Sequence, residues 1–561
     1  MRLNNFEQST HLKLISILIV LSYFLLMFGN GIISLTHPDE VFYIQSSKEM
    51  VEQNSWFTPL IFDGVQFEKP FLAFALFGIV LKWFGYHPSV ARFWPSFFGM
   101  LGVVMVYILA YAMFQKKRLA FIASIMLSSS FIYLALSRAV LTDMIFSTWI
   151  LITIMFFYLA YHKPDYKQKG VYLGFVFMAV AVLTKGLLGI TFPVMTMLLY
   201  LIYKKDLKCI FSATVFKGLL LFLLLALPWH IAMYRIHGPW FLQEYFGNVH
   251  WRRIFVSEHP KIDTWYFYLG LMFAGVLPWS LFWVPALKRL GDHFKGRTGV
   301  KDQVVFLLCW IAGVYIFVQP AHSKLASYIF PLFPAIVIFL AEYIHFAIDK
   351  SEQGEPVKSF KICLYVMAVV LIGVSAGGLL VGYKFIDVVV NMSSIYVFAL
   401  VLLSISVSLF LLAQQNKFQR AFFVFLGINA GLLTMLFLAR PYIEPWVSCR
   451  QISDKFNEIQ LHKDSVVIAS KFYVRGIRYY TGRKMAVIDI NGKGFFSPHH
   501  TIPFLNTDQK VIDFLKSQKV TYAIVKEGNV EDLKRIAKGL SYVLEDLGGE
   551  GGKYILKIKK L

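Results

Sequence analysis

Residues 14–40, LISILIVLSYFLLMFGNGIISLTHPDE, decide the fold class of this protein. The apolar run from Leu14 to Leu35 is long enough to cross the hydrocarbon core of a bilayer as a helix. It exceeds the length of a signal-peptide core and no small-residue cleavage site follows it, so we expect this span to be retained. The run leads directly into His37-Pro38-Asp39-Glu40. The sequence therefore predicts an acidic loop at the boundary between lipid and water.

Apolar runs of similar length recur over the first 440 residues. The chain is 57% hydrophobic and only 16% charged, which is outside the usual range of soluble domains. We expect about 13 membrane-spanning helices. After the first span they cover residues 90–114, 119–136, 141–161, 171–183, 187–203, 215–234, 264–287, 304–318, 328–346, 362–383, 395–412 and 421–438.

The basic residues of the short connections predict the orientation of the chain. Lys and Arg gather in every second connection if the helices alternate in direction, and such connections are typically cytoplasmic. These connections contain Lys116 to Arg118, Lys163 to Lys169, Lys204 with Lys205 and Lys208, Lys288 to Lys301, Lys350 with Lys358, and Lys417 with Arg420. The N-terminus is then cytoplasmic, and the Asp39 loop and the tail after Arg440 lie on the outer side.

The tail, residues 441–561, has the pattern of a small α/β domain. Short apolar segments that suit buried strands alternate with helical segments. The predicted strands are 465–470, 485–489, 520–525 and 553–559, and the predicted helices are 473–480, 511–518 and 531–539. The domain carries neither a glycine-rich phosphate loop nor a nucleophile elbow, so we expect it to support the site or handle an acceptor.

The distribution of charge argues against nucleic-acid binding, and the cysteine positions argue against a cysteine metal site and a disulfide. The formal charge of +22 suggests nucleic acid, but many of the basic residues lie in the cytoplasmic connections, where anionic lipids are the natural partners. No soluble domain that interleaves basic and aromatic residues accompanies them. The cysteines at 209, 309, 363 and 449 have no metal-ligand spacing, and we expect no disulfide.

Six polar clusters fall on the outer face under this topology. Each has an ordinary structural interpretation: Asp39 suits a helix N-cap, Lys185 suits a lysine that extends to the interface, and His250 suits an interfacial belt. Independent anchors would be expected at both faces, so convergence on one face favours a site built from long outer loops at 36–89 and 235–263. The clusters are Asp39-Glu40, Glu68-Lys69, Asp143, Lys185, His250 with Arg252 and Arg253, and Lys324 with Tyr328.

Several of these motifs, in the same order, resemble those of bacterial lipid A aminoarabinose transferases. These enzymes stand with the protein O-mannosyltransferases in the GT-C superfamily of membrane glycosyltransferases. The resembling segments are HPDEVFYIQSSKEM (37–50), FEKPFLAFAL (67–76), LTDM (141–144), LTKGLLGI (183–190), PWHIAMYRIHGPWFLQEYFGNVHWRRI (228–254) and SKLASYIFPLFPA (323–335). The resemblance implies a GT-C domain over residues 1–440 and a periplasmic α/β domain over residues 441–561.

The resemblance also implies a reaction. A sugar moves from undecaprenyl phosphate to lipid A or a related envelope glycolipid at the periplasmic face of the inner membrane, with inversion and without a required cofactor. A carboxylate is suited to take the proton of the attacking hydroxyl. That role matches Asp39, or Glu40 as second choice. Phosphate binding matches Lys69, Arg253 and Tyr328, and the substrate cavity matches Tyr43, Asp143, Lys185, Arg252 and Lys324.

Metal binding and three departures from the family pattern complete the comparison of motifs. Glu68 and His250 match positions that can hold a structural zinc ion between two outer loops, although two ligands are fewer than an ordinary zinc site has. Phe42 stands where these transferases commonly carry an arginine, three residues after the loop aspartate, and this puts the identity of the sugar in question. Phe71 replaces the second proline of Glu-Lys-Pro-Pro, and Val249 replaces a glutamate.

Two alternatives remain open at this point. The acceptor can be a protein hydroxyl, as in O-mannosylation. In a different class, the chain can be a transporter or flippase of lipid-linked sugars, which would place ionisable groups near the membrane midplane between internal repeats. The sequence shows neither repeats nor midplane chains of acids.

Overall fold

The computed structural model describes residues 9–257, 260–384, 392–459, 465–490, 492 and 502–560. Residues 258 and 259 of the second predicted outer loop lie outside this set. The chain divides into two compact units. The helical unit comprises Met1–Gly29, Arg92–Leu242 and His250–Leu438, and the loop–sheet unit comprises Asn30–Ala91, Gln243–Val249 and Ala439–Leu561.

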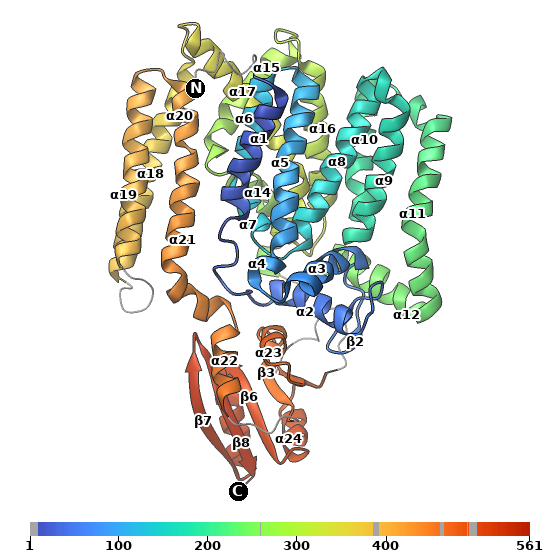
Figure 1. Ribbon diagram of the computed structural model, residues 1–561, viewed down its shortest axis with the longest axis vertical. Coiled ribbons are helices and arrows are strands. Elements are labelled where there is room, and N and C mark those ends of the chain that lie inside the picture. Colours follow the sequence, from blue (N-terminus) through green and yellow to red (C-terminus); the bar gives the residue numbers. More distant parts are fainter. Residues whose placement is uncertain are drawn as a thin grey trace. The chain divides into compact units, whose positions relative to one another are not determined.

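The helical unit is a bundle of long apolar helices (Figure 1). Within the described residues, eight helices are long and apolar enough to span a membrane, or up to ten if each of two bent pairs is one span. The principal helices are α1 (His11–Ser22), α5 (Phe93–Phe114), α6 (Lys117–Ser128), α7 (Phe131–Ser137), α8 (Thr142–His162), α9 (Lys167–Lys185), α10 (Leu188–Lys204), α11 (Ala213–His237), α14 (Phe267–Gly275), α15 (Trp283–Phe294), α16 (Lys301–Val318), α17 (Phe333–Glu352), α18 (Lys358–Lys384), α19 (Met392–Gln414), α20 (Phe418–Val424) and α21 (Leu426–Val447).

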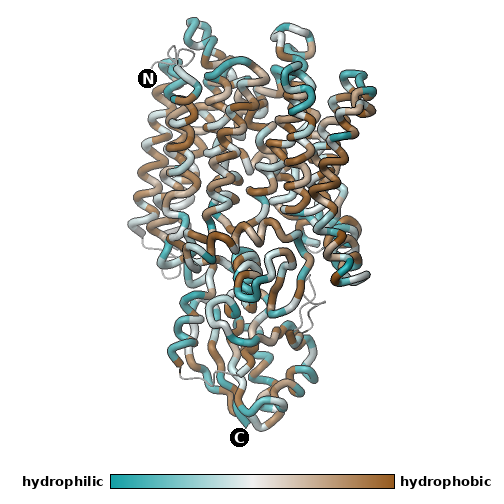
Figure 2. The backbone as a smooth tube through the Cα atoms, turned by 45° about the vertical axis from the view of Figure 1, so that its right-hand side comes forward, coloured by the Kyte–Doolittle hydropathy of each residue, from teal (hydrophilic) through white to brown (hydrophobic). Residues whose placement is uncertain are grey.

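Each predicted span overlaps one of these helices or a bent pair of them, but the first span, predicted over 14–35, is helical only as far as Met27. Hydropathy is high along the middle of the helices and low near their ends (Figure 2). Three predicted spans are not among the eight long helices and two bent pairs. They are α9, α10 and α1, and α1 continues as the π-helix η2 (Tyr23–Met27). The protein is therefore a polytopic membrane protein, as its composition predicts.

Two of the predicted spans are broken. The helix pair α6 and α7 bends by 63° and the pair α14 and α15 bends by 107°. At the first break, the hydroxyls of Ser129 and Ser130 donate to the carbonyls of Ile125 and Met126, both at 2.6 Å. Such side-chain bonds compete with the helical ladder. At the second break stands Pro278, which has no N–H to continue a helix. Hydropathy alone detects neither break.

The first outer loop is an ordered part of the loop–sheet unit. It folds into helix α2 (Asp39–Glu52), the hairpin of β1 (Leu60–Ile61) and β2 (Gly64–Val65), helix α3 (Phe71–Phe84) and the short helix α4 (Pro88–Ala91). The hairpin turns at Phe62 and Asp63, whose φ angles are 53° and 61°. Two successive positive φ values are typical of a two-residue hairpin turn.

The C-terminal part of the loop–sheet unit is a six-stranded mixed sheet with helices, which confirms the predicted small α/β domain. Strand order is β5-β4-β3-β6-β8-β7, parallel from β5 to β6 and antiparallel at β8 and β7. The prediction missed β5, β7 and α22. The elements are α22 (Arg450–Glu458), β3 (Val467–Ser470), α23 (Val474–Thr481), β4 (Met485–Ile488), β5 (Phe504–Leu505), α24 (Asp508–Lys516), β6 (Val520–Lys526), α25 (Glu527–Gly539), β7 (Tyr542–Glu550) and β8 (Lys553–Lys560).

The stretch that precedes α2 is fastened to the chain around residue 447. The backbone N–H of Ser34 donates to a carboxylate oxygen of Glu444 at 3.0 Å, and the N–H of His37 donates to the carbonyl of Val447 at 3.1 Å. The Ser448 hydroxyl donates to the carbonyl of Leu35 at 2.9 Å. These bonds join residues more than 400 positions apart in the sequence. They fix the entry to α2, and hence to Asp39, against the start of the C-terminal domain.

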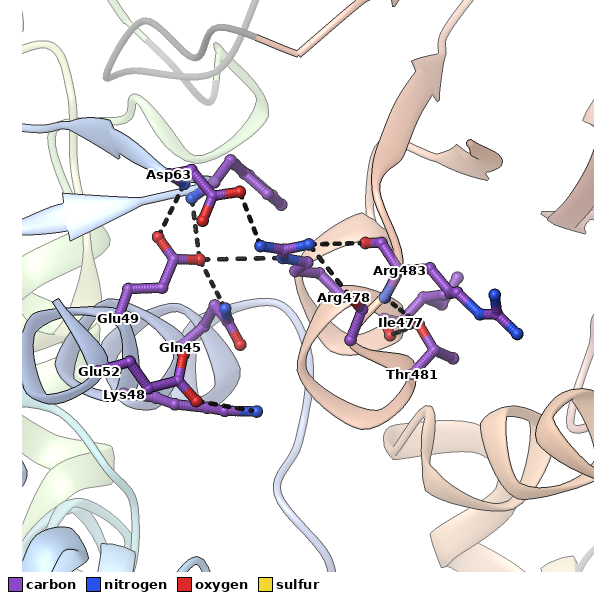
Figure 3. Close-up of polar contacts among 11 residues, drawn as sticks. Gln45, Lys48, Glu49, Glu52, Asp63, Ile477, Arg478, Thr481 and Arg483 are labelled. Atoms are coloured by element: carbon purple, nitrogen blue, oxygen red, sulfur yellow. Dashed lines mark hydrogen bonds and ion pairs between the residues drawn. The ribbon is translucent and has the colours of Figure 1, made fainter. Parts of the chain in front are cut away.

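A second attachment joins α2 to α23 through Arg478 (Figure 3). The carboxylate of Glu49 accepts the backbone N–H groups of Phe62 and Asp63 at 3.1 and 2.9 Å. The Arg478 guanidinium lies 3.9 Å from Glu49 and 2.8 Å from the Asp63 carboxylate. Burial raises the pKa of Glu49, although these donors and the arginine oppose the rise. One buried carboxylate thus ties the hairpin, α2 and α23 together.

Candidate active site

Asp39 is the first residue of helix α2, and its side chain is exposed. Pro38 occupies the N-cap position and supplies no side-chain cap, so the N-cap interpretation of Asp39 is wrong. The carboxylate stands in the first helical turn, where the helix dipole favours negative charge. An exposed carboxylate that is held by the start of a helix is available to a substrate.

Glu40 is held differently from Asp39. It is buried, and one carboxylate oxygen accepts both the backbone N–H of Thr36 at 2.8 Å and the Thr36 hydroxyl at 2.9 Å. These bonds close the turn that leads into α2. Of the two adjacent acids, Glu40 fastens the loop and Asp39 faces outward.

Glu68 and Lys69 form a turn that Gln66 holds against α2. The buried Gln66 amide donates to the Ser46 hydroxyl at 3.1 Å, and its carbonyl oxygen accepts the backbone N–H of Glu68 at 2.9 Å. Lys69 is 6% exposed, and its ammonium group donates to the carbonyl of Glu68 at 3.1 Å. Because the Lys69 side chain is buried this deeply, its ammonium group can reach only a few neighbouring groups.

Tyr43 lies one turn after Asp39 on the buried face of α2. Its ring packs against Phe42, Phe74 and Phe77, at centroid distances of 5.1, 5.7 and 6.4 Å. The loop–sheet unit therefore brings together Asp39, Tyr43 and the Glu68-Lys69 turn, because α2 and the start of α3 pack on each other.

In the helical unit, Asp143 and Lys185 form a buried ion pair. Asp143 lies in the first turn of α8 and Lys185 is the last residue of α9, so each charge is at the helix end whose dipole favours it. The lysine ammonium group donates to the aspartate carboxylate, and the two side chains are 4% and 6% exposed. Neither residue is a simple interfacial anchor.

Lys185 also connects to Tyr328 and Arg253. Its ammonium group lies 5.2 Å from the centroid of the Tyr328 ring, and an Arg253 N–H donates to the Tyr328 hydroxyl at 3.4 Å. Tyr328 belongs to the 3-10 helix η8 (Ala326–Leu332), and Arg253 belongs to α13 (Arg252–Phe255). Four predicted site residues, Asp143, Lys185, Tyr328 and Arg253, thus form one continuous set of contacts.

Lys324 stands beside this set and is held by an acid that the sequence analysis did not single out. Its buried ammonium group donates to the Asp263 carboxylate at 2.9 Å, and His322 contacts the same carboxylate at 2.8 Å. The hydrogen bond from Lys324, followed by that from His322, holds the pKa of Asp263 below its usual value. Lys324 therefore carries a local partner, and Asp263 is a supporting residue of the site.

The remaining predicted residues, Arg252 and His250, lie on the same segment. Arg252 is exposed, and the His250 ring nitrogen Nε2 accepts the backbone N–H of Leu187 at 3.4 Å. Within the described part of the chain, no three His, Cys, Asp or Glu side chains gather as a metal site. The Glu68 and His250 pair belongs to two different units, and zinc binding by this pair stays a prediction.

A cavity of about 830 Å³ lies at the other ends of α8, α9 and α10. Tyr161, His162, Lys167 and Asp206 are among its lining residues, and the predicted site residues are not among them. Its lining begins on α8 at Phe157, about 21 Å along the helix from Asp143, and ends on α9 at Met178, about 10 Å along the helix from Lys185. It is separate from the candidate site.

Two supporting residues were missed by the sequence analysis: Gln66 and Asp263. Gln66 acts through the Ser46 hydroxyl and the backbone N–H of Glu68, and Asp263 acts through Lys324 and His322. Single positions in a sequence carry no signal of such pairing.

Fold and side chains together define the class: a polytopic membrane protein with basic and acidic groups gathered on an ordered loop and at helix ends, and with an α/β domain after the last span. Two crystal structures of ArnT from Cupriavidus metallidurans have this architecture over 97% of both chains. The one bound to undecaprenyl phosphate has a TM-score of 0.75 at 18% identity, and the apo form has a TM-score of 0.76 at 19% identity. The chain therefore has the fold of these structures, and the predicted fold class, a polytopic helical membrane protein with a small C-terminal α/β domain, is confirmed.

Sequence comparisons lead to the same group of proteins. The family described as dolichyl-phosphate-mannose-protein mannosyltransferase matches residues 12–239. Undecaprenyl phosphate-alpha-4-amino-4-deoxy-L-arabinose arabinosyl transferase 2 of Proteus mirabilis (strain HI4320) is 26% identical over 67% of this chain and 65% of its own. The corresponding transferase of Yersinia pestis (strain Pestoides F) is 30% identical over 55% of each chain. The chain thus spans less than two thirds of the length of these curated relatives.

Proposed function

We propose that this chain is a glycosyltransferase that takes a sugar from undecaprenyl phosphate and transfers it to lipid A or a related envelope glycolipid. The observation that supports this most is the connected set Asp143, Lys185, Tyr328 and Arg253 within a fold shared with an undecaprenyl phosphate-bound ArnT. The names of the curated relatives support the same donor and transfer. The proposed location is the inner membrane, with the N-terminus cytoplasmic and residues 441–561 periplasmic.

In the proposed reaction, Asp39 is the general base. The acceptor hydroxyl attacks the anomeric carbon, its proton passes to the Asp39 carboxylate, and the bond from the anomeric carbon to the phosphate oxygen breaks. The product sugar has inverted configuration, and undecaprenyl phosphate leaves with its electron pair. The exposed carboxylate of Asp39 is accessible to an acceptor, whereas Glu40 is engaged with Thr36.

The cations of the site have a separate role. Negative charge develops on the leaving phosphate, and preorganised cations lower the barrier to that change. Lys69, Arg253 and Tyr328 are the proposed phosphate-binding groups. The proposed substrate cavity is completed by Tyr43, Asp143, Lys185, Arg252 and Lys324. The proposed active site is formed by outer loops 36–89 and 235–263 of a domain over residues 1–440.

The position of the ion pair supports this function over that of a flippase. Asp143 lies at the beginning of α8 and Lys185 lies at the end of α9, whereas transport pathways place ionisable groups near the middle of the membrane. Charges at the helix ends suit a reaction at one face.

Mass spectrometry of lipid A tests the proposal. Cells that carry the gene are compared with a deletion strain and with a strain that expresses Asp39→Asn at equal protein level. We expect a mass increment of a pentosamine, a hexosamine or a hexose on lipid A only with the unaltered protein. Unchanged lipid A together with a lost protein glycan would instead support a protein acceptor.

A further inference from the structure

Arg475 comes from the C-terminal domain and packs on the loop helix that begins with Asp39. It lies in the first turn of α23 and is 8% exposed. Its guanidinium carbon stands 4.5 Å from the centroid of the Phe42 ring, in the geometry of a cation–π contact. Phe42 is itself fixed, because its ring contacts Tyr43 and Phe74 at centroid distances of 5.1 and 6.1 Å.

The charge partners of Arg475 are the acids of the candidate site. Burial lowers the pKa of Arg475, and the charges of Glu68, Asp39 and Tyr43 oppose this shift, in that order of strength. A buried arginine is costly unless opposite charges compensate it. Two carboxylates at one site also repel each other and favour protonation of one of them, unless a cation compensates their charge. Arg475 and these acids therefore compensate one another.

Arg478, Lys553 and Lys69 make contacts with other groups of the same unit. Arg478, one turn further along α23, pairs with Glu49 and Asp63. Lys553 lies near His37 and donates to the carbonyl of Pro445 at 2.7 Å. Lys69 donates to a backbone carbonyl. Arg475 is thus a cation that contacts Phe42 and whose pKa responds to the charges of the site acids.

The contact between Arg475 and Phe42 matters because Phe42 lies three residues after Asp39. Position 42 carries an uncharged ring in this chain. The guanidinium that contacts Phe42 comes instead from a residue 433 positions later in the chain. The positive charge beside this part of α2 therefore comes from α23.

We propose that Arg475 is a positioning residue of the sugar-transfer site: it holds the Asp39 and Glu68 carboxylates in their working arrangement and supplies the positive charge that position 42 lacks. This inference rests on the proposed function. It assigns the C-terminal domain a direct part in the reaction, beyond support of the loop.

The test uses the full-length protein in proteoliposomes, with undecaprenyl phosphate-4-amino-4-deoxy-L-arabinose as donor and lipid A as acceptor. Arg475→Met should lower kcat about 100-fold and leave KM for the donor within about threefold, because misplaced catalytic groups lose rate rather than donor affinity. Arg475→Lys should fall between this variant and the unaltered protein. The matched control Arg478→Met removes an arginine from the same helix and should retain kcat per folded molecule.

The decisive variant moves the positive charge from position 475 to position 42. Phe42→Arg in the Arg475→Met background should recover kcat at least tenfold, because an arginine at position 42 reaches the space over the present ring. A kcat of Arg475→Met within threefold of the unaltered protein would overturn the inference. So would the absence of recovery in the double variant.

A second readout does not depend on sugar transfer and so separates this inference from the proposed function. The thermal unfolding midpoint is measured for Arg475→Met with Glu68 present and with Glu68→Gln. The destabilisation should be smaller by at least half in the Glu68→Gln background, where one carboxylate no longer needs compensation. Equal destabilisation in both backgrounds would refute the coupling, whether or not the chain transfers this donor.

Discussion

At the scale of single residues, Asp39 and Glu40 show how neighbours in sequence separate into different roles. Asp39 is the exposed start of α2, and Glu40 closes the turn through Thr36. Side chains on consecutive helical positions point about 100° apart, so only one of the two can face a substrate. Backbone geometry, rather than acidity, therefore decides which of the two carboxylates can face a substrate.

Replacing Asp39 by Asn tests the general base. The change keeps the size of the side chain and removes its basicity, so kcat for sugar transfer should fall by about 10²- to 10⁴-fold. Asp63→Asn is the matched control, because Asp63 is an exposed acid of the same loop. Transfer is measured per folded molecule in proteoliposomes. Full activity of Asp39→Asn would remove Asp39 from the mechanism.

The buried pair of Asp143 and Lys185 makes a prediction about stability. Asp143→Leu leaves an uncompensated ammonium group in a site that is 4% exposed, and removing one partner of a buried pair typically costs about 3 to 5 kcal/mol. Asp143→Leu combined with Lys185→Met should cost less than the single change. Unfolding of the purified protein in detergent measures both. Additive losses in the double variant would contradict a direct pair.

The same two residues show how far sequence reasoning extends. Each was predicted as a site residue, because a charge at the end of an apolar run requires an explanation. Their pairing was not predicted, since it depends on how α8 and α9 pack. Arg475 and Asp263 were missed for the same reason: their partners lie far away in the sequence.

At the scale of elements, apolar runs predicted the position of every span but not its shape. The bends after α6 and α14 arise from serine hydroxyls that bond to the backbone and from a proline, and these are features of local hydrogen bonding rather than of hydropathy. For the first outer loop, the sequence suggested only a surface helix after Asp39, as one interpretation of that residue. Its hairpin turn is held by the Glu49 carboxylate, and the turn before α3 is held by Gln66.

The attachment of the loop predicts a pH dependence through His37. Its ring contacts those of Phe472 and Tyr473, and burial, followed by the charge of Lys553, lowers the pKa of His37 to about 4. The unfolded chain has the ordinary value of 6.5, so it binds a proton more readily than the folded chain. Stability from this residue is complete above pH 6.5 and is lost as the pH falls toward 4, by at most about 3 kcal/mol.

Replacing His37 by Phe isolates this effect. The aromatic contacts remain and the titrating group is absent, so the unfolding midpoint should change less between pH 7 and pH 4.5 than that of the unaltered protein. Thermal unfolding in detergent at the two pH values measures the difference. Equal pH dependence of both proteins would show that other groups are responsible.

At the scale of the whole molecule, the orientation of the chain stays a prediction from its basic connections. Alkaline phosphatase is active only after export, so its fusion after Leu561 should be active, and its fusion within the 163–169 connection should be inactive. Green fluorescent protein at the same two positions should give the opposite result. An inactive phosphatase at the C-terminus would reverse the topology and remove the proposed periplasmic site.

The hydrogen bonds between Ser34 to His37 and Glu444 to Ser448 have a consequence for biosynthesis. The Asp39 loop leaves the ribosome among the first parts of the chain, yet its attachment points are made about 400 residues later. Because contacts across such a separation form only when both ends exist, the loop reaches its final conformation after the last span has been inserted. A nascent or truncated chain therefore lacks the assembled loop, and the proposed reaction cannot begin before synthesis is complete.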